Sequence, residues 1–260
     1  MSTLSMISLP IDLRGFRQWA ATRAFSVDEG RALHHLLGEA FGSGTIKPYR
    51  LMVARGARRG TLYGYTMKDE VQLRATALET GTPDVLAVAN PARLATKELP
   101  ATWRTGRRLA FDVRIRPVRR LIKPLEGQTR EQERHRQLGT EVPPAFRKGA
   151  EVDAFLVERL RSHRDGPPDG ADLRDREAVY IDWLKERLQP AAELIAQRTR
   201  MAHYRRIIVD RRERSEGPDA IMHGELAITD CATFSHLLIK GLGRHTSYGY
   251  GMLLLRPAEG

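Results

Sequence analysis

Four glycines fall within residues 241–251, which read GLGRHTSYGYG, and the apolar run Met252 to Leu255 follows at once. Glycine adopts backbone conformations with positive φ and lets the chain approach a neighbour closely. An arginine, a histidine and two tyrosines stand between the glycines, which is a composition poorly suited to a hydrophobic core. The pattern therefore predicts a loop that lies against a ligand, followed by a buried strand. A tight helix-to-strand connection with incidental glycines is the alternative interpretation.

The first hundred residues alternate between strand and helix signals. Residues 4–11 alternate apolar and polar side chains, which predicts a strand. Ser26 as N-cap and Glu29 three residues later form a capping box that predicts the start of a helix. Gly42 or Gly44 ends this helix. Its apolar positions recur at helical spacing: Leu33, Leu36, Leu37, Ala40 and Phe41.

Two strands and a second helix follow in the same half of the chain. Residues 49–54 and 61–65 are predicted to pair as strands around a turn rich in glycine and arginine, and residues 68–80 read as a helix. The resulting order, β-α-β-β-α, is that of a ferredoxin-like fold. Around residues 91–107 the pattern dissolves, which predicts a domain junction.

The second half repeats this order around an insertion. Residues 108–116 alternate, with Leu109, Phe111, Val113 and Ile115 on one face and Arg108, Arg114 and Arg116 more exposed. Strands are expected near 201–210 and 220–228, then a helix near 231–240 and a final strand after the glycine loop. Removing most of residues 119–180 leaves β-α-β-β-α-β. The prediction is an α+β protein with two tandem ferredoxin-like (RRM-like) domains, residues 1–100 and 101–260.

The insertion at about 119–180 has a composition of its own. Residues 119–149 are basic and rich in glutamine, proline and glycine. Two helical stretches, 152–163 and 174–197, flank the breaker Gly-Pro-Pro-Asp-Gly at 166–170. We therefore expect a basic helical insertion within the second domain. A solvated linker is the alternative.

The charge balance indicates a polyanionic partner. The net charge is +11 and the isoelectric point is about 10.2, with arginine in excess over lysine. The planar arginine fork suits phosphates and base edges. No stretch is apolar enough to span a bilayer, and Pro10, Asp12 and Arg14 interrupt any secretory signal, so a cytoplasmic protein without a membrane partner is expected. The single cysteine, Cys231, excludes disulfides and cysteine-based metal sites.

Adjacent histidines in the first long helix are candidates for proton transfer. His34 and His35 cannot both point inward, because neighbours on a helix are about 100° apart. Arg23 and Arg31 lie nearby in sequence, and Arg31 is three residues before His34 on the same helix face. A histidine among guanidinium groups suits the movement of a proton while phosphate charge is held. Sequence motifs for a two-metal nuclease, HExxH, a P-loop or CxxC are absent, so a mechanism without metal or other cofactor is expected.

These features resemble a known family. Gly241, Gly243, Gly249 and Gly251 fill the four glycine positions of the G-h-G-x(5)-G-x-G-hhhh signature of CRISPR-associated repeat-RNA-processing endoribonucleases of the RAMP superfamily. His34 precedes Phe41 by seven residues, as the catalytic histidine precedes a phenylalanine in the type I-E branch. Arg31 stands where that branch often has a tyrosine, and no equivalent of its catalytic lysine is identified. The large insertion and the arginine-rich site look more like the type IV counterpart.

The resemblance implies an enzyme of antiviral defence. It would recognise the CRISPR repeat hairpin, cleave precursor crRNA by attack of a 2′-OH on the adjacent phosphate, leave a 2′,3′-cyclic phosphate, and stay bound beside other subunits of an effector complex. The implied catalytic residues are His34, His35, Arg23, Arg31 and Arg244. The implied RNA-binding residues are Arg119, Arg120, Lys123, Arg130, Arg134, Arg136, Arg147 and Lys148 of the insertion, and Gly241, Gly243, His245, Ser247, Tyr248, Gly249 and Gly251 of the loop.

Two other functions stay open from the sequence. The first is a non-catalytic crRNA-binding subunit of a CRISPR ribonucleoprotein, since a fold alone does not establish catalysis. The second is a generic basic adaptor, which would not prefer a hairpin over scrambled RNA. Whether histidine or arginine carries the chemistry is also left open.

Overall fold

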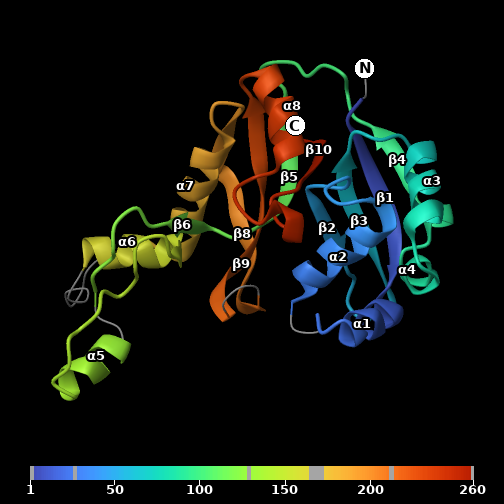
Figure 1. The fold of residues 1–260 in the computed structure, drawn as a ribbon. Coiled ribbons are helices and arrows are strands. Elements are labelled where there is room, and N and C mark those ends of the chain that lie inside the picture. The colour runs from blue at the N-terminus through green and yellow to red at the C-terminus, as the bar shows by residue number, and fades with distance from the viewer. Residues whose placement is uncertain (1–2, 26–27, 128–129, 164–172, 211–213, 259–260) are drawn as a thin grey trace. The chain divides into compact units, whose positions relative to one another are not determined.

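The computed structural model describes residues 3–25, 28–127, 130–163, 173–210 and 214–258. The chain forms two compact units, Met1–Arg116 with Arg187–Gly260, and Pro117–Glu186. The larger unit holds two four-stranded antiparallel sheets (Figure 1). The strand orders are β2-β3-β1-β4 and β10-β5-β9-β8, and each is the order of a ferredoxin-like fold. The predicted α+β class with tandem ferredoxin-like folds is confirmed, while the domain limits at residues 100 and 101 stay a prediction.

The first sheet is built around the predicted N-terminal strand. Along β1 the side chains of Ile7, Leu9 and Ile11 are fully buried and alternate with more exposed ones. They pack in one core with Leu33 and Leu36 of the helix that follows. The strands of this sheet are β1 (Ser5–Asp12), β2 (Tyr49–Met52), β3 (Arg59–Thr66) and β4 (Ala95–Glu98).

The elements of the first half differ from the prediction in several places. The predicted N-cap Ser26 lies outside the described residues, and the observed N-cap of α2 is Asp28, whose carboxylate accepts from the Arg31 N–H at 3.0 Å. Helix α1 was not predicted; its Asp12 cap accepts two backbone N–H groups. The predicted junction at 91–107 contains β4. The helical elements are α1 (Leu13–Thr22), α2 (Glu29–Phe41), α3 (Glu70–Thr80), α4 (Pro83–Val88) and the 3₁₀ turn η1 (Pro91–Arg93).

The second sheet contains two strands much longer than predicted. β8 covers nineteen residues and carries irregular pairing between Ile195 and His203. Arg116, expected to be exposed, is 5% exposed, because its side chain lies over Gly217 of β9. The elements of this half are β5 (Arg108–Ile115), β8 (Ala192–Asp210), β9 (Arg214–Ile228), α8 (Cys231–Lys240), the 3₁₀ turn η2 (Thr246–Tyr248) and β10 (Leu253–Pro257).

The helix predicted over 174–197 is wrong in its second half. α7 (Arg176–Leu188) ends just before Pro190, which has no backbone N–H and clashes with a preceding helical turn. The residues beyond it begin β8. The helix predicted over 152–163 begins too early. Its first two residues belong to the strand β7 (Glu151–Asp153), and the helix α6 covers Ala154–Ser162.

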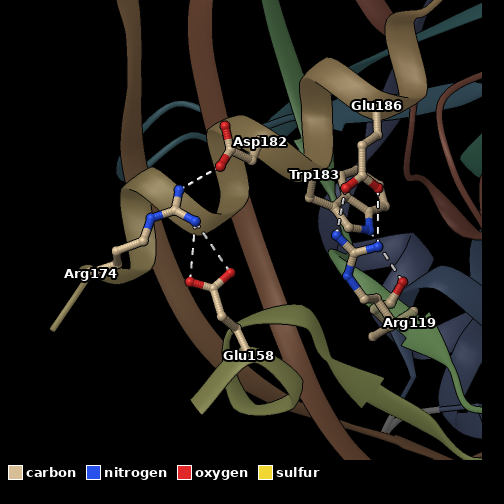
Figure 2. A network of polar contacts seen from close by, with 7 residues as sticks. Arg119, Glu158, Arg174, Asp182, Trp183 and Glu186 are labelled. Carbon is tan, nitrogen blue, oxygen red and sulfur yellow. Dashed lines mark hydrogen bonds and ion pairs between the residues drawn. The ribbon is translucent and has the colours of Figure 1, made fainter. Parts of the chain in front are cut away.

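The smaller unit has its own core and ion pairs. Leu121, Leu125, Val152 and Val157 are buried together. Arg119 pairs with Glu186, and Arg174 bridges Glu158 and Asp182, as Figure 2 shows. Besides β7, α6 and most of α7, it contains β6 (Val118–Arg120), which pairs with β7, and α5 (Arg130–Gln137), which was not predicted. The basic segment contributes β6, α5 and the buried Leu121 and Leu125 to this unit.

Candidate active site

Helix α2 directs its two histidines to different neighbours. Its apolar face packs into the core, which leaves His34 half-buried and His35 exposed. The ring centre of His34 lies 5.2 Å from that of Tyr248 in the glycine loop. His35 instead stacks on Phe25, with ring centres 4.4 Å apart and planes at 8°. Only His34 is thus placed against the glycine loop.

The glycine loop has the backbone that its sequence demands. Gly241, Gly243, Gly249 and Gly251 have φ of 77°, 74°, 82° and 75°, a region that side chains disfavour. A Cβ on Gly251 would lie 2.2 Å from the Leu242 carbonyl oxygen. The loop therefore tolerates no side chain at this position.

The loop lies directly on the first turns of α2. A Cβ on Gly30 would lie 2.6 Å from the Tyr248 carbonyl oxygen, so the two backbones are in close contact. The Tyr49 hydroxyl donates to the Ser247 carbonyl at 2.8 Å, and the Gly30 carbonyl oxygen lies 3.1 Å from it. Tyr49 is 1% exposed, so this link is shielded from water. It fixes the loop relative to the helix that carries His34.

A lysine that the sequence reasoning missed belongs to this arrangement. His34, Lys47 and Ser247 line one small pocket of about 10 Å³, together with Gly42 and Gly44. Lys47 is exposed, and its backbone N–H donates to the Tyr65 carbonyl at 2.9 Å. The only sequence signal was a lysine within the glycine-rich segment that directly follows the histidine helix. A histidine and a lysine that line one pocket suit proton transfer beside a negative charge.

The candidate arginines lie apart from this pocket. Arg23 pairs with Asp84 at 2.9 Å and with Glu39 at 3.5 Å, and its guanidinium covers the Trp19 ring. Arg31 lies over the Phe25 ring at 5.0 Å, the same ring on which His35 stacks. Arg244 is exposed in the loop. None of the three lines the pocket of His34.

The candidate RNA-binding residues of the insertion separate into two kinds. Arg119 donates to both carboxylate oxygens of Glu186, at 2.7 and 3.0 Å (Figure 2). The side chain of Arg130 lies outside the described residues. The others are exposed: Arg120, Lys123, Arg134, Arg136, Arg147 and Lys148. In the loop, Gly241 and Gly249 are buried, whereas His245, Ser247 and Tyr248 are partly exposed.

Two classes of feature are absent from the described ranges. Within them no three histidine, cysteine or acidic side chains are grouped so that they could bind a metal ion. No described helix is both long enough and apolar enough to cross a membrane.

Residues 6–257 match the model of the CRISPR-associated protein family. The chain belongs to this family. Three solved structures share its fold, each covering 98% of this chain and 100% of its own at 16% identity. They are Thermus thermophilus Cse3 bound to an RNA representing a pre-cleavage complex (TM-score 0.62), Cas6e of Escherichia coli K-12 (0.50), and a chain of a CRISPR RNA-guided surveillance complex (0.53). No curated protein sequence matches the chain.

Proposed function

We propose that this CRISPR-associated protein is an endoribonuclease that cleaves precursor crRNA within the repeat. The observation that carries the proposal is the placement of His34, Lys47 and Ser247 around one pocket beneath a glycine loop. The net charge of +11 favours a nucleic-acid substrate. Support also comes from the similar fold of Thermus thermophilus Cse3, which was solved with RNA in a pre-cleavage complex.

The proposed reaction is an in-line attack within the RNA itself. The 2′-OH attacks the adjacent phosphate, the bond from phosphorus to the 5′-oxygen breaks, and a 2′,3′-cyclic phosphate and a 5′-hydroxyl form. His34 transfers a proton, either from the 2′-OH or to the leaving oxygen. Lys47 stabilises the charge that develops on the phosphorane oxygens. No metal is required for any of these roles.

The proposal also assigns the insertion to recognition and retention of the RNA. A-form stems are bound mainly through phosphates and shape, which the exposed basic residues of Pro117–Glu186 suit. Retention of the product in an effector complex is supported by the similar fold found in a CRISPR RNA-guided surveillance complex.

The decisive experiment combines a chelator with a modified substrate. We expect the protein to cut its repeat RNA at one position in EDTA. A single 2′-deoxy substitution at that position should stop cleavage and leave binding nearly unchanged, since it removes only the nucleophile. Cleavage that requires magnesium would contradict the proposed mechanism. Tight hairpin binding without any cleavage would identify a non-catalytic crRNA-binding subunit instead.

A further inference from the structure

The turn between β2 and β3, rich in glycine and arginine, forms a basic patch together with the start of α1. Within the turn the Ala57 N–H donates to the Ala54 carbonyl at 3.1 Å, and Gly56 has a φ of 74°. The Leu13 N–H at the start of α1 donates to the Arg58 carbonyl at 3.1 Å, which places the turn beside this helix. We call the exposed arginines of the two elements the arginine patch: Arg14, Arg17, Arg55, Arg58 and Arg59.

The positive charge of the arginine patch exceeds the negative charge beside it. Within the part of the chain that the structure describes, none of the five guanidinium groups donates a hydrogen bond or forms an ion pair. Asp12 is the neighbouring carboxylate. Its pKa is lowered by hydrogen bonds from the Gly15 and Arg14 N–H groups and by the charges of Arg59 and Arg14. Five positive charges against one negative charge make this surface attractive to a polyanion.

A groove of about 500 Å³ opens beside the patch. Arg17 lines it, together with Leu13 and with Val53, which begins the turn and is 49% exposed. Among the described residues of its lining, Glu29 is the one carboxylate, and its side chain is 56% exposed. The rest of the lining is apolar: Phe16, Ala20, Phe25 and Ala32. An apolar groove with a cationic rim suits a nucleobase whose neighbouring phosphates lie on the rim.

Helix α2 connects this groove with the His34 pocket. Ala32 of α2 lines the groove, and Phe25 in the groove wall stacks on His35 with ring centres 4.4 Å apart. The rings of His34 and His35 lie 5.5 Å apart. Gly38 follows one turn later, and a Cβ there would meet no neighbouring atom of the described chain within 4 Å. An RNA strand that leaves His34 can therefore cross the outer face of α2 and reach the groove.

We propose that the arginine patch and this groove bind the single-stranded RNA that flanks the repeat hairpin, with phosphates on the arginines and a base in the groove. The inference rests on the proposed function, because it takes RNA as the polyanion. It adds a site for unpaired RNA that is separate from recognition of the stem by the insertion. An acidic protein segment would also be attracted by the arginines. The connection to the His34 pocket favours RNA, and the experiment separates the two.

The test compares two double variants on two RNAs. Arg55→Gln with Arg58→Gln removes two charges from the arginine patch, and Arg93→Gln with Arg104→Gln removes two exposed charges elsewhere in the same unit. Fluorescence anisotropy would measure affinity for a non-cleavable repeat hairpin, either blunt or with single-stranded flanks. We expect the patch variant to bind flanked RNA about tenfold more weakly, as for two exposed ion pairs, and to bind the blunt hairpin like the wild type. The control variant should bind both RNAs like the wild type.

Salt dependence and an abasic flank test the patch and the groove separately. Loss of two phosphate contacts to a single strand should reduce the slope of log affinity against log salt by about 1.4. With the wild type, removal of the bases from the flank should weaken binding, because no base then occupies the groove. Equal affinity for the abasic and the ordinary flank would overturn the assignment of the groove.

Equal losses on blunt and flanked RNA, or no loss in the patch variant, would overturn the inference, while cleavage of the blunt hairpin by the wild type still upheld the proposed function. A selective loss of flanked RNA without any cleavage by the wild type would uphold the RNA site and refute the nuclease. Unchanged RNA affinity with weaker binding of purified effector-complex subunits would identify an acidic protein partner instead. If the patch variant does not fold, Arg17→Gln with the same RNAs replaces it.

Discussion

At the scale of single residues, two adjacent histidines have different surroundings and therefore different expected roles. His34 lies against the glycine loop, and His35 stacks on Phe25. We expect His34→Ala to lower the single-turnover cleavage rate by about 10²–10⁴-fold, the usual contribution of a positioned acid or base, with little change in RNA affinity. His35→Ala is the matched control, with an effect below about tenfold. Kinetics with saturating protein would measure both, and a larger loss in His35→Ala would reverse the assignment.

The signature glycines give a second prediction at this scale. Gly251 and Gly106 both have positive φ, but a Cβ has open space at Gly106 and meets the Leu242 carbonyl at 2.2 Å in Gly251. Gly106→Ala should cost about 1–2 kcal/mol of unfolding free energy from backbone strain alone. Gly251→Ala should cost clearly more, because a backbone atom must also move. Urea denaturation would compare them, and equal losses would show that the loop adapts to the side chain.

At the scale of elements, the basic residues of the insertion fall into two groups. The charge of one group is exposed to solvent, and the charge of the other is paired with a carboxylate of the protein. Arg134 and Arg136 of α5 are exposed, whereas Arg119 is paired with Glu186. We expect Arg134→Ala and Arg136→Ala each to reduce the slope of log affinity against log salt by about one, as for a lost phosphate contact. Arg119→Ala should leave that slope unchanged and lower thermal stability. Titrations of hairpin RNA at several salt concentrations would show the difference, and an equal slope change in all three would contradict it.

Helices and strands with one clear hydrophobic periodicity were predictable from the sequence. Elements whose periodicity and residue propensities disagree with their pairing were not. The apolar positions of α2 follow helical spacing, and all five of them are buried. Residues 192–197 read as helix because alanine, glutamate, leucine and glutamine favour helices. Pairing with β9 overrides that propensity, since strand preference depends on the neighbouring strand. Pro190 was the sequence signal for the end of the helix α7.

At the scale of the whole molecule, acid stability depends on the buried carboxylate of Asp219. Burial acts to raise its pKa, but hydrogen bonds and charge from Arg114 and Arg205 outweigh burial and hold the pKa below its ordinary value. Because the folded pKa is the lower one, the stabilisation is complete above the unfolded value of about 3.9 and is lost as pH falls through the folded value. We expect Asp219→Asn to lower the melting temperature at pH 6 and to flatten its decline in acid. Calorimetry between pH 6 and pH 3 would test this, and parallel declines would refute it.

The candidate site was only partly predictable at this scale. The glycine loop and His34 were identified because each follows a local pattern in sequence. Lys47 and Arg116 were missed or misjudged because their surroundings come from distant segments. Arg116 alternates like an exposed strand residue, yet the Gly217 backbone of β9 covers it. Such burial results from tertiary packing and does not appear in the hydrophobic periodicity of the sequence.

The hydrogen bond from Tyr49 to Ser247 joins residues 198 positions apart. During synthesis, α2 and its histidine leave the ribosome long before residues 241–251 do, and domains form in that order. A nascent chain therefore carries the helix but has no loop against which His34 can act. For a protein proposed to cut RNA, this order of synthesis leaves the incomplete chain inactive while it is surrounded by messenger and ribosomal RNA.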